Sequence, residues 1–178
     1  MQEFSGIPAA PGYAVGPVHV IRRRVVTVPR RTIQPQEVAA ERKRFEAAIA
    51  RAGEELKDLI DKLARELGPK EAEILSSQLL MLEDELVWDA TLAHIRTGLV
   101  NAETAFARAV GDIVLQFSGV KEEALRERLD DVHDLEARVL VALAGAPPLA
   151  DFTPPAPSLL AARNLTPSET AGLDRTKV

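Results

Sequence analysis

The sequence of 178 residues contains no cysteine, which excludes disulfide bonds, thiolate metal sites and a cysteine nucleophile. The absence of cysteine fits a cytoplasmic protein, because disulfide-stapled folds belong to oxidising compartments. The first residues, MQEFSGIPAAPG, show neither the basic segment nor the apolar segment of a secretory signal peptide. Together these absences predict a cytoplasmic location.

Long hydrophobic runs and an excess of positive charge are also missing. No apolar run approaches the roughly 20 residues of a membrane-spanning helix, so we expect no membrane insertion. The net charge of −5 argues against a nucleic-acid partner. Aromatic residues make up only 4% of the chain, whereas Ala, Leu, Glu and Arg are abundant, and this composition favours helices.

Residues 1–33 are rich in Pro, Gly and β-branched residues, which predicts strands rather than helices. Two short strands are expected, Phe4 to Ile7 and Val15 to Ile21, joined by the turn-rich stretch PAAPGYAVGP. Arginines cluster after the second strand, at positions 22–24 and 30–31. A solvated strand end is the favoured explanation of these arginines, and contact with an anion or phosphate is the alternative.

Residues 34–145 are predicted to be helical almost throughout. The first helix is expected to begin at Pro35, which suits a first helical turn, and to end at Gly68-Pro69. Its apolar residues follow steps of three, four and seven, the stripe of an amphipathic helix: Val38, Phe45, Ile49, Leu56, Leu59, Ile60, Leu63 and Leu67.

Three further helices complete the helical part of the prediction. The second is expected to start at Lys70 and to continue, with a bend at residues 83–85, to Gly98. Asn101 is expected to cap the third, and the fourth covers about Glu122 to Leu143. Short loops between amphipathic helices predict antiparallel neighbours in a four-helix bundle.

Residues 146–178 change character again. The proline-rich stretch APPLADFTPPAP predicts a connector that leaves the bundle, and Ser158 to Ala162 predict a buried strand. Thr166 and Glu169 have the spacing of a capping box, and Gly172 is expected to end that short helix. Since strands are predicted on both sides of the bundle, the two ends are expected to pair in one small α/β region.

Familiar catalytic motifs are missing from the sequence. It has no Walker-type phosphate loop and no GxSxG, and none of His19, His94 and His133 has the spacing of a zinc motif. His133 lies one helical turn from Asp130. A solvated, ion-paired histidine is the favoured interpretation of His133, ahead of a metal ligand.

The run Glu83-Asp84-Glu85 allows three interpretations: an acidic bend, a Mg²⁺ site, or the charged rim of a protein-docking surface. The bend is favoured over the metal site. The rim is better supported, because the neighbouring apolar residues are too many for one buried stripe, and some must face outward or meet a partner: Leu79, Leu80, Met81, Leu82 and Leu86.

Four segments, taken in order, resemble the start of the enzyme I family of the bacterial phosphotransferase system: GIPAAPGYAVGPV, LLMLEDELV, RERLDDVHDLEARVL and LTPSETAGLDRTKV. The resemblance covers the whole chain. It implies a mainly α fold, with a four-helix HPr-binding bundle inserted in an incomplete α/β phosphohistidine (swivelling) domain. The implied parts are N-terminal strands in 1–33, the HPr-binding subdomain in 34–145 and the return to the α/β domain in 146–178.

The resemblance also implies a function, that of a phosphoenolpyruvate–protein phosphotransferase in sugar uptake. The family transfers a phosphoryl group from phosphoenolpyruvate to a histidine and then to the phosphocarrier HPr, which docks on the helical subdomain. Phosphoenolpyruvate and Mg²⁺ bind a separate C-terminal domain in the family, so no cofactor is expected in this chain. The family's homodimer also forms through that domain, so we expect this chain to be a monomer or to associate weakly through a sheet edge.

Alignment with the family carries its HPr contacts onto the second and fourth predicted helices: Gln78, Leu80, Met81, Glu85, Leu125 and Arg128. Arg128 is expected to meet the phosphoryl group or a carboxylate, because a planar guanidinium suits both. Two departures bear on docking. Enterobacterial members have a histidine at the position of Gln78 and an acidic pair at that of Pro69-Lys70.

The family's phosphorylated histidine lies in a Gly-Gly-x-Thr-Ser-His motif that would follow LTPSETAGLDRTKV, after Val178. Thr170 matches the family threonine that hydrogen-bonds this histidine. None of the three histidines of the chain matches it, so no catalytic residue is assigned. The chain is therefore expected to be an N-terminal fragment that docks HPr and is inactive alone.

Two other classes of protein fit the motifs less well. A stand-alone helical adaptor without enzymatic activity would not need an interrupted strand region at both ends. A relative of pyruvate phosphate dikinase or of phosphoenolpyruvate synthase would lack a helical insert with LLMLEDELV at this place.

Overall fold

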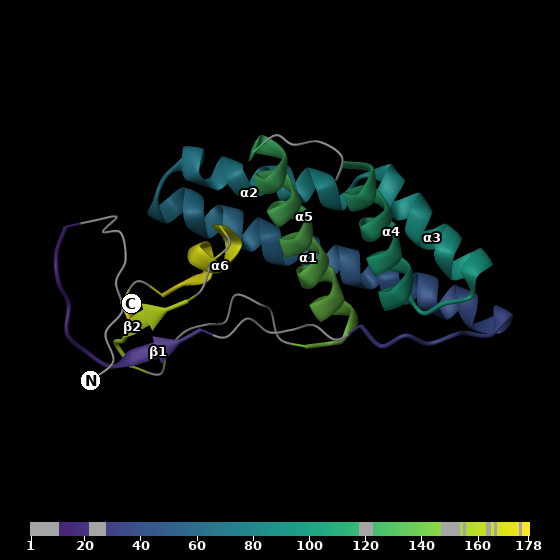
Figure 1. The fold of residues 1–178 in the computed structure, drawn as a ribbon, viewed down its shortest axis with the longest axis horizontal. Helices are drawn as coiled ribbons and strands as arrows, with labels where there is room; N and C mark the ends of the chain where they lie inside the picture. The colour runs from purple at the N-terminus through teal and green to yellow at the C-terminus, as the bar shows by residue number, and fades with distance from the viewer. Residues whose placement is uncertain are drawn as a thin grey trace.

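A computed structural model describes residues 11–21, 28–117, 123–146, 154, 156–162, 165, 167–174 and 176–178. The expected strand at Phe4 to Ile7, the arginines at 22–24 and the expected cap at Thr166 lie outside these residues. Within them, long helices pack beside a small two-stranded sheet (Figure 1). The mainly α class expected from the sequence is confirmed. None of the helices in the described ranges combines the length and apolar character that a membrane crossing requires.

Helix α1 (Val38–Glu66) follows a 3-10 turn, η1 (Pro35–Glu37). At about 1.5 Å per residue, its 29 residues span roughly 43 Å. The chain turns out of α1 at Gly68, whose φ of 113° is costly for any residue with a Cβ. One face of α1 is buried at helical spacing: Phe45, Ala48, Ala52, Leu56 and Leu63. This burial confirms the predicted stripe as far as Leu63, whereas its last predicted member, Leu67, follows the helix and is 40% exposed.

Helices α2 (Pro69–Leu82) and α3 (Glu85–Gly98) replace the single bent helix that the sequence analysis expects. That expectation is wrong at Glu83 and Asp84, where the chain leaves the helical conformation. Asp84 has an extended backbone (φ −67°, ψ 119°), and its carboxylate Oδ1 accepts the N–H of Leu86 at 2.8 Å. This N-cap bonds an N–H that has no partner within α3, so Asp84 starts a new helix.

Helix α4 (Ala102–Phe117) packs on α3, and α5 (Glu123–Leu143) contacts α1 and α4 (Figure 1). Buried side chains from α1 to α5 form one hydrophobic core, which Ile33 and Val100 of the connecting segments complete. The ring centroid of Phe45 lies 5.1 Å from that of Trp88 and 5.8 Å from that of Phe106. Aromatic pairs at such separations add about 0.5–1.5 kcal/mol each beyond their burial, so Phe45 holds a central place in the stability of the core.

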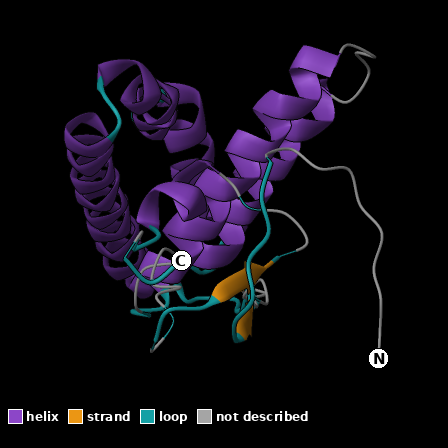
Figure 2. Ribbon diagram, turned by 90° about the vertical axis from the view of Figure 1, so that its left-hand side faces the viewer, coloured by secondary structure: helices purple, strands orange, loops and turns teal. Residues whose placement is uncertain are grey.

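The two ends of the chain meet in a parallel pair of strands, β1 (Val18–Val20) and β2 (Leu159–Ala161), drawn in orange in Figure 2. Val18 lies opposite Leu159, and the backbone of Ile21 continues the ladder by donating to the carbonyl of Ala161 at 2.9 Å. The expected pairing of the two ends is confirmed, although both strands are shorter than the apolar runs suggest.

A short helix, α6 (Pro167–Gly172), rests against α1 and α2 (Figure 1). Ala171 packs in a small apolar cluster with Leu63 and Leu75. Lys62 Nζ lies 3.3 Å from the carbonyl oxygen of Gly172 and 3.2 Å from that of the next residue, and donates to both. These contacts confirm the predicted short helix and fix it on the bundle.

Candidate functional site

The junction of α2 and α3 is an elbow that exposes apolar and acidic side chains together. Leu80 is 72% exposed and Leu86 is 75% exposed, whereas Leu82 is buried in the core and Met81 is half-buried. The prediction that some of these apolar residues face outward is therefore confirmed. We define the elbow surface by six residues: Leu80, Met81, Glu83, Asp84, Glu85 and Leu86.

The acidic residues of the elbow surface also have a local structural reason. Asp84 is the N-cap of α3, and Glu85 lies in its first turn, where the helix dipole favours a negative charge. Glu83, Asp84 and Glu85 are all exposed, so each carboxylate remains hydrated. The elbow surface therefore presents three negative charges beside two exposed leucines.

Gln78, which the resemblance marks as a docking contact, is fully buried between α2 and α5. Its Nε2 lies 3.2 Å from Asp131 Oδ1 and 3.4 Å from Asp134 Oδ2, while its Oε1 has no hydrogen-bond partner within the described part of the chain. Gln78 therefore has no exposed surface with which to contact a partner in this conformation. Its position was readable in the sequence, because it lies three residues after Leu75 and four before Leu82, the spacing of a buried face.

Arg138 extends this polar layer from α5 to α1, and sequence reasoning missed it. The side chain is 2% exposed, and its Nη1 lies 3.6 Å from Glu55 Oε2. Burial lowers the pKa of the Arg138 guanidinium, and the carboxylates of Asp134 and Glu55 oppose that shift. Among the described residues, no group hydrogen-bonds its Nε or Nη1. The layer joins α1, α2 and α5 through polar groups, and so positions α2 and the elbow that follows it.

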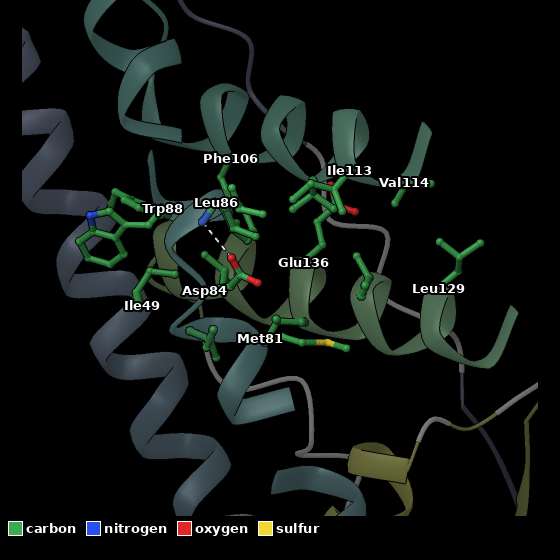
Figure 3. Close-up of a pocket in the computed structure, with 17 residues that line it drawn as sticks. Ile49, Met81, Asp84, Leu86, Trp88, Phe106, Ile113, Val114, Leu129 and Glu136 are labelled. Atoms are coloured by element: carbon green, nitrogen blue, oxygen red, sulfur yellow. Dashed lines mark hydrogen bonds between the residues drawn. The ribbon is translucent and has the colours of Figure 1, made fainter. Parts of the chain in front are cut away.

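A cavity of about 360 Å³ lies behind the elbow and is lined by residues of all five helices α1 to α5, together with Asp84 between α2 and α3 (Figure 3). Most of its lining is aliphatic or aromatic. Two carboxylates also line it, Asp84 from the elbow and Glu136 from α5. Met81 and Leu86 belong both to the lining and to the elbow surface, so the cavity and the surface are continuous.

A second charged cluster fastens the segment before α1 to the first turns of α1 and α4. Arg44 pairs with Glu41 at 2.7 Å and with Glu103 at 2.5 Å. Arg31 pairs with Glu37 at 2.8 Å and with Glu41 at 2.5 Å. The hydrogen bond to Glu103 raises the pKa of Arg44, and the hydrogen bond to Glu37 raises the pKa of Arg31. Each of these carboxylates is paired, so the cluster has a structural role and holds the segment before α1 against α1 and α4.

Comparison with known families decides where the chain belongs. Residues 5–128, more than half of the chain, match the family model described as PEP-utilising enzyme, N-terminal. The chain belongs to this PEP-utilising enzyme family. The matched residues include the whole of α1 to α4 and the elbow surface between α2 and α3.

Curated relatives of this PEP-utilising family member are named phosphoenolpyruvate-protein phosphotransferase. The protein of Bacillus subtilis (strain 168) is 35% identical over 181 residues, which cover 98% of this chain and 30% of that protein. The protein of Haemophilus influenzae (strain ATCC 51907 / DSM 11121 / KW20 / Rd) is 32% identical over 177 residues, with the same two shares. The chain thus spans 30% of the length of these relatives.

Solved structures of similar proteins agree with the fold of this PEP-utilising family member. A solution structure of enzyme I superposes with a TM-score of 0.78 at 28% identity, over 93% of this chain and 66% of that one. The N-terminal domain of a nitrogen enzyme 1 superposes with a TM-score of 0.67 at 23% identity, over 96% of this chain and 69% of that one, which supports the fold alone. The expected arrangement, a helical bundle joined to an α/β region, is therefore confirmed.

The docking residues expected for this PEP-utilising family member lie on two elements. Leu80, Met81 and Glu85 belong to the elbow surface, with the exposures given above. Leu125 and Arg128 lie on α5, where the backbone is described and these two side chains are not. The docking contacts at these five positions remain predictions.

The histidines of this PEP-utilising family member lie on three different elements. His19 lies in β1. His94 lies on α3, with Nε2 3.4 Å from Asp112 Oδ2. His133 lies on α5 and is exposed, with Nδ1 3.4 Å from Glu136 Oε2. The favoured prediction for His133, a solvated histidine beside a carboxylate, is confirmed with Glu136 as its partner.

Thr170, the expected partner of the family's phosphorylated histidine, lies exposed on α6. In the described ranges, no group of three or more His, Asp or Glu side chains is arranged to hold a metal ion. The acidic run at residues 83–85 instead ends α2 and begins α3.

Proposed function

We propose that this chain is the partner-docking region of a phosphoenolpyruvate–protein phosphotransferase, enzyme I of the bacterial phosphotransferase system. In this proposal the elbow surface binds the small phosphocarrier protein HPr. The observation that carries the proposal is the exposure of Leu80 and Leu86 beside three carboxylates. Similarity to named phosphotransferases along 98% of the chain supports the parent activity.

Burial of the two exposed leucines supplies a driving force for docking. Complete burial of a leucine side chain is worth about 1.5–3 kcal/mol, and Leu80 and Leu86 still expose most of their surface. Together they would contribute roughly 2–4 kcal/mol before the entropic cost of association. Glu83 and Glu85 beside them favour a partner face that carries basic residues. HPr in this family offers an apolar face with basic residues around its active histidine, so both features match.

We extend the docking surface to Leu125 and Arg128 of α5. Leu129, one helical turn after Leu125, lines the same cavity as Met81 of the elbow surface. This shared lining brings the first half of α5 close to the elbow, so one partner can span both elements. Arg128 would then pair with a carboxylate or a phosphoryl group of the partner, for which its planar guanidinium is suited.

We place the phosphoryl-transfer steps in parts of enzyme I that the relatives have beyond the 30% aligned with this chain. Phosphoenolpyruvate and Mg²⁺ would bind there, and no catalytic residue is assigned here. Incubation of the chain with labelled phosphoenolpyruvate and a separate carboxyl-terminal domain should leave it unlabelled. Label on His19, His94 or His133 would contradict this division of roles.

The docking proposal is tested by titrating the ¹⁵N-labelled chain with unlabelled HPr and following amide shifts. We expect the largest shifts at the elbow surface and in the first half of α5. Leu67 is the internal reference, because it precedes α2, whose 14 residues at about 1.5 Å each separate it from the elbow by roughly 20 Å. Saturating HPr without shifts at residues 80–86, or with shifts centred on Leu67, would refute the proposal.

A further inference from the structure

Beyond the docking of a protein, we propose that the cavity behind the elbow binds a small amphiphilic amine. The ligand would have an apolar body, such as one aromatic ring or a short alkyl chain, and a terminal ammonium group. The proposal rests on three properties of the cavity: its volume, the chemistry of its lining and the sign of the charges at its edge.

The volume is that of a ligand site rather than of a packing defect. Well-packed protein interiors hold few voids larger than a water molecule, whereas pockets for small molecules usually measure about 300–1,000 Å³. The cavity of about 360 Å³ falls in the second class. Three aromatic side chains, Phe45, Trp88 and Phe106, line it together with aliphatic ones, and such a lining favours an apolar body.

The charges of the lining select the polar end of the ligand. Asp84 and Glu136 are the charged residues among the described ones that line the cavity, so both charges are negative (Figure 3). Asp84 uses Oδ1 for the N–H of Leu86, and Glu136 has Oε2 near His133. No described residue hydrogen-bonds the second oxygen of either carboxylate, which leaves both able to accept from an ammonium group. A carboxylate ligand would instead be repelled.

The cavity is reachable from solvent through the elbow. Asp84 and Leu86 line it and are themselves exposed, so a ligand can enter beside them. Because Met81 and Leu86 also belong to the elbow surface, a bound amine would compete with a docked protein. The amine site does not depend on the proposed function, and its test requires no HPr.

Trp88 provides the measurement, because it lines the cavity and is the single tryptophan of the chain. Its fluorescence is followed while the chain is titrated with 2-phenylethylamine, 2-phenylethanol and 3-phenylpropionate near neutral pH. These probes share a ring and a similar length but carry a positive, a neutral and a negative end. We expect a saturable change with the amine, weaker binding of the alcohol and the weakest binding of the carboxylate.

Two variants test the role of the carboxylates while keeping the shape of the site. Asp84→Asn retains a residue that caps helices well, and Glu136→Gln retains the length of the side chain. Each should weaken the binding of the amine roughly two- to fivefold, the range of a partly hydrated ion pair, and leave the binding of the alcohol unchanged. Glu83→Gln is the matched control, because Glu83 carries the same charge at the elbow without lining the cavity.

The possible results separate the parts of the proposal. A Trp88 signal that does not saturate with the amine would overturn the site. Equal affinities for the amine and the carboxylate, or an equal loss in the Glu83→Gln control, would overturn recognition of the ammonium group. Thermal unfolding gives an independent reading, since a bound amine should raise the melting temperature of the unsubstituted chain and raise that of Asp84→Asn less.

Discussion

Replacing Asp84 by alanine tests why α2 and α3 are separate helices. The Asp84 carboxylate accepts the N–H of Leu86 at 2.8 Å, and its backbone is extended where a continuous helix would be αR. Loss of such an N-cap costs about 1 kcal/mol, within a range of roughly 0.5–2 kcal/mol. Asp84 is exposed, so its removal relieves no buried charge that could offset this cost. For a chain of this length, 1 kcal/mol lowers the melting temperature by roughly 2–4 °C.

The measurement is urea and thermal unfolding of the Asp84→Ala variant, followed by circular dichroism, with two matched controls. Asp84→Asn keeps a capping oxygen and should lose only a few tenths of a kcal/mol. Glu83→Ala removes the neighbouring exposed carboxylate, which caps nothing, and should change stability by less than about 0.5 kcal/mol. Equal losses for Asp84→Ala and Glu83→Ala would refute the capping argument and point to charge alone. Unchanged stability of Asp84→Ala would refute it as well.

Two further predictions concern the hydrophobic core and the loss of stability at acid pH. Phe45→Ala removes a fully buried ring that pairs with two others, and should lower the free energy of unfolding by about 3–5 kcal/mol in urea unfolding. Phe45→Leu should cost clearly less, and equal costs would contradict a central role of the ring. The hydrogen bonds from the Gln34 N–H and from Arg31 hold the pKa of the Glu37 carboxyl below its ordinary 4.5. The ionised Glu37 therefore stabilises the fold above pH 4.5, and this stabilisation is lost as the pH falls through the lowered pKa of the folded state. Unfolding measured across this acid range should therefore be less pH-dependent in Glu37→Gln than in the control Glu54→Gln; the same pH dependence in both variants would refute the assignment.

The regular part of the fold was predictable because helical periodicity reflects burial on one face. The stripe predicted from Val38 is buried or half-buried as far as Leu63, and β1 pairs with β2 as two apolar runs flanking a helical region suggest. A bend was predicted at residues 83–85, but the break into two helices was not, because the apolar residues before Glu83 and after Glu85 continue a helical pattern. Asp84 followed by an apolar run is the signal of an N-cap, but the same residue in an exposed helical bend would look identical in the sequence.

The interior polar layer and the cavity could not be derived from periodicity. Gln78 occupies a core position of α2, yet only the packing of α5 shows that its amide meets Asp131 and Asp134 rather than solvent. Arg138 is buried and lies beside Glu55 of α1, and the sequence of α5 alone does not reveal that α1 packs there. The cavity depends on how far apart several helices lie, which is set by all their side chains at once.

The central claim, that the elbow surface docks HPr, is tested most directly by calorimetric titration of HPr into leucine variants. Leu80→Ser and Leu86→Ser should each weaken binding about tenfold, because each removes roughly 1.4 kcal/mol of apolar burial at the interface. Leu67→Ser, which lies before the start of α2 and far from the elbow, is the matched control and should bind as tightly as the unsubstituted chain. Unchanged affinity in both elbow variants, or an equal loss in Leu67→Ser, would contradict the claim.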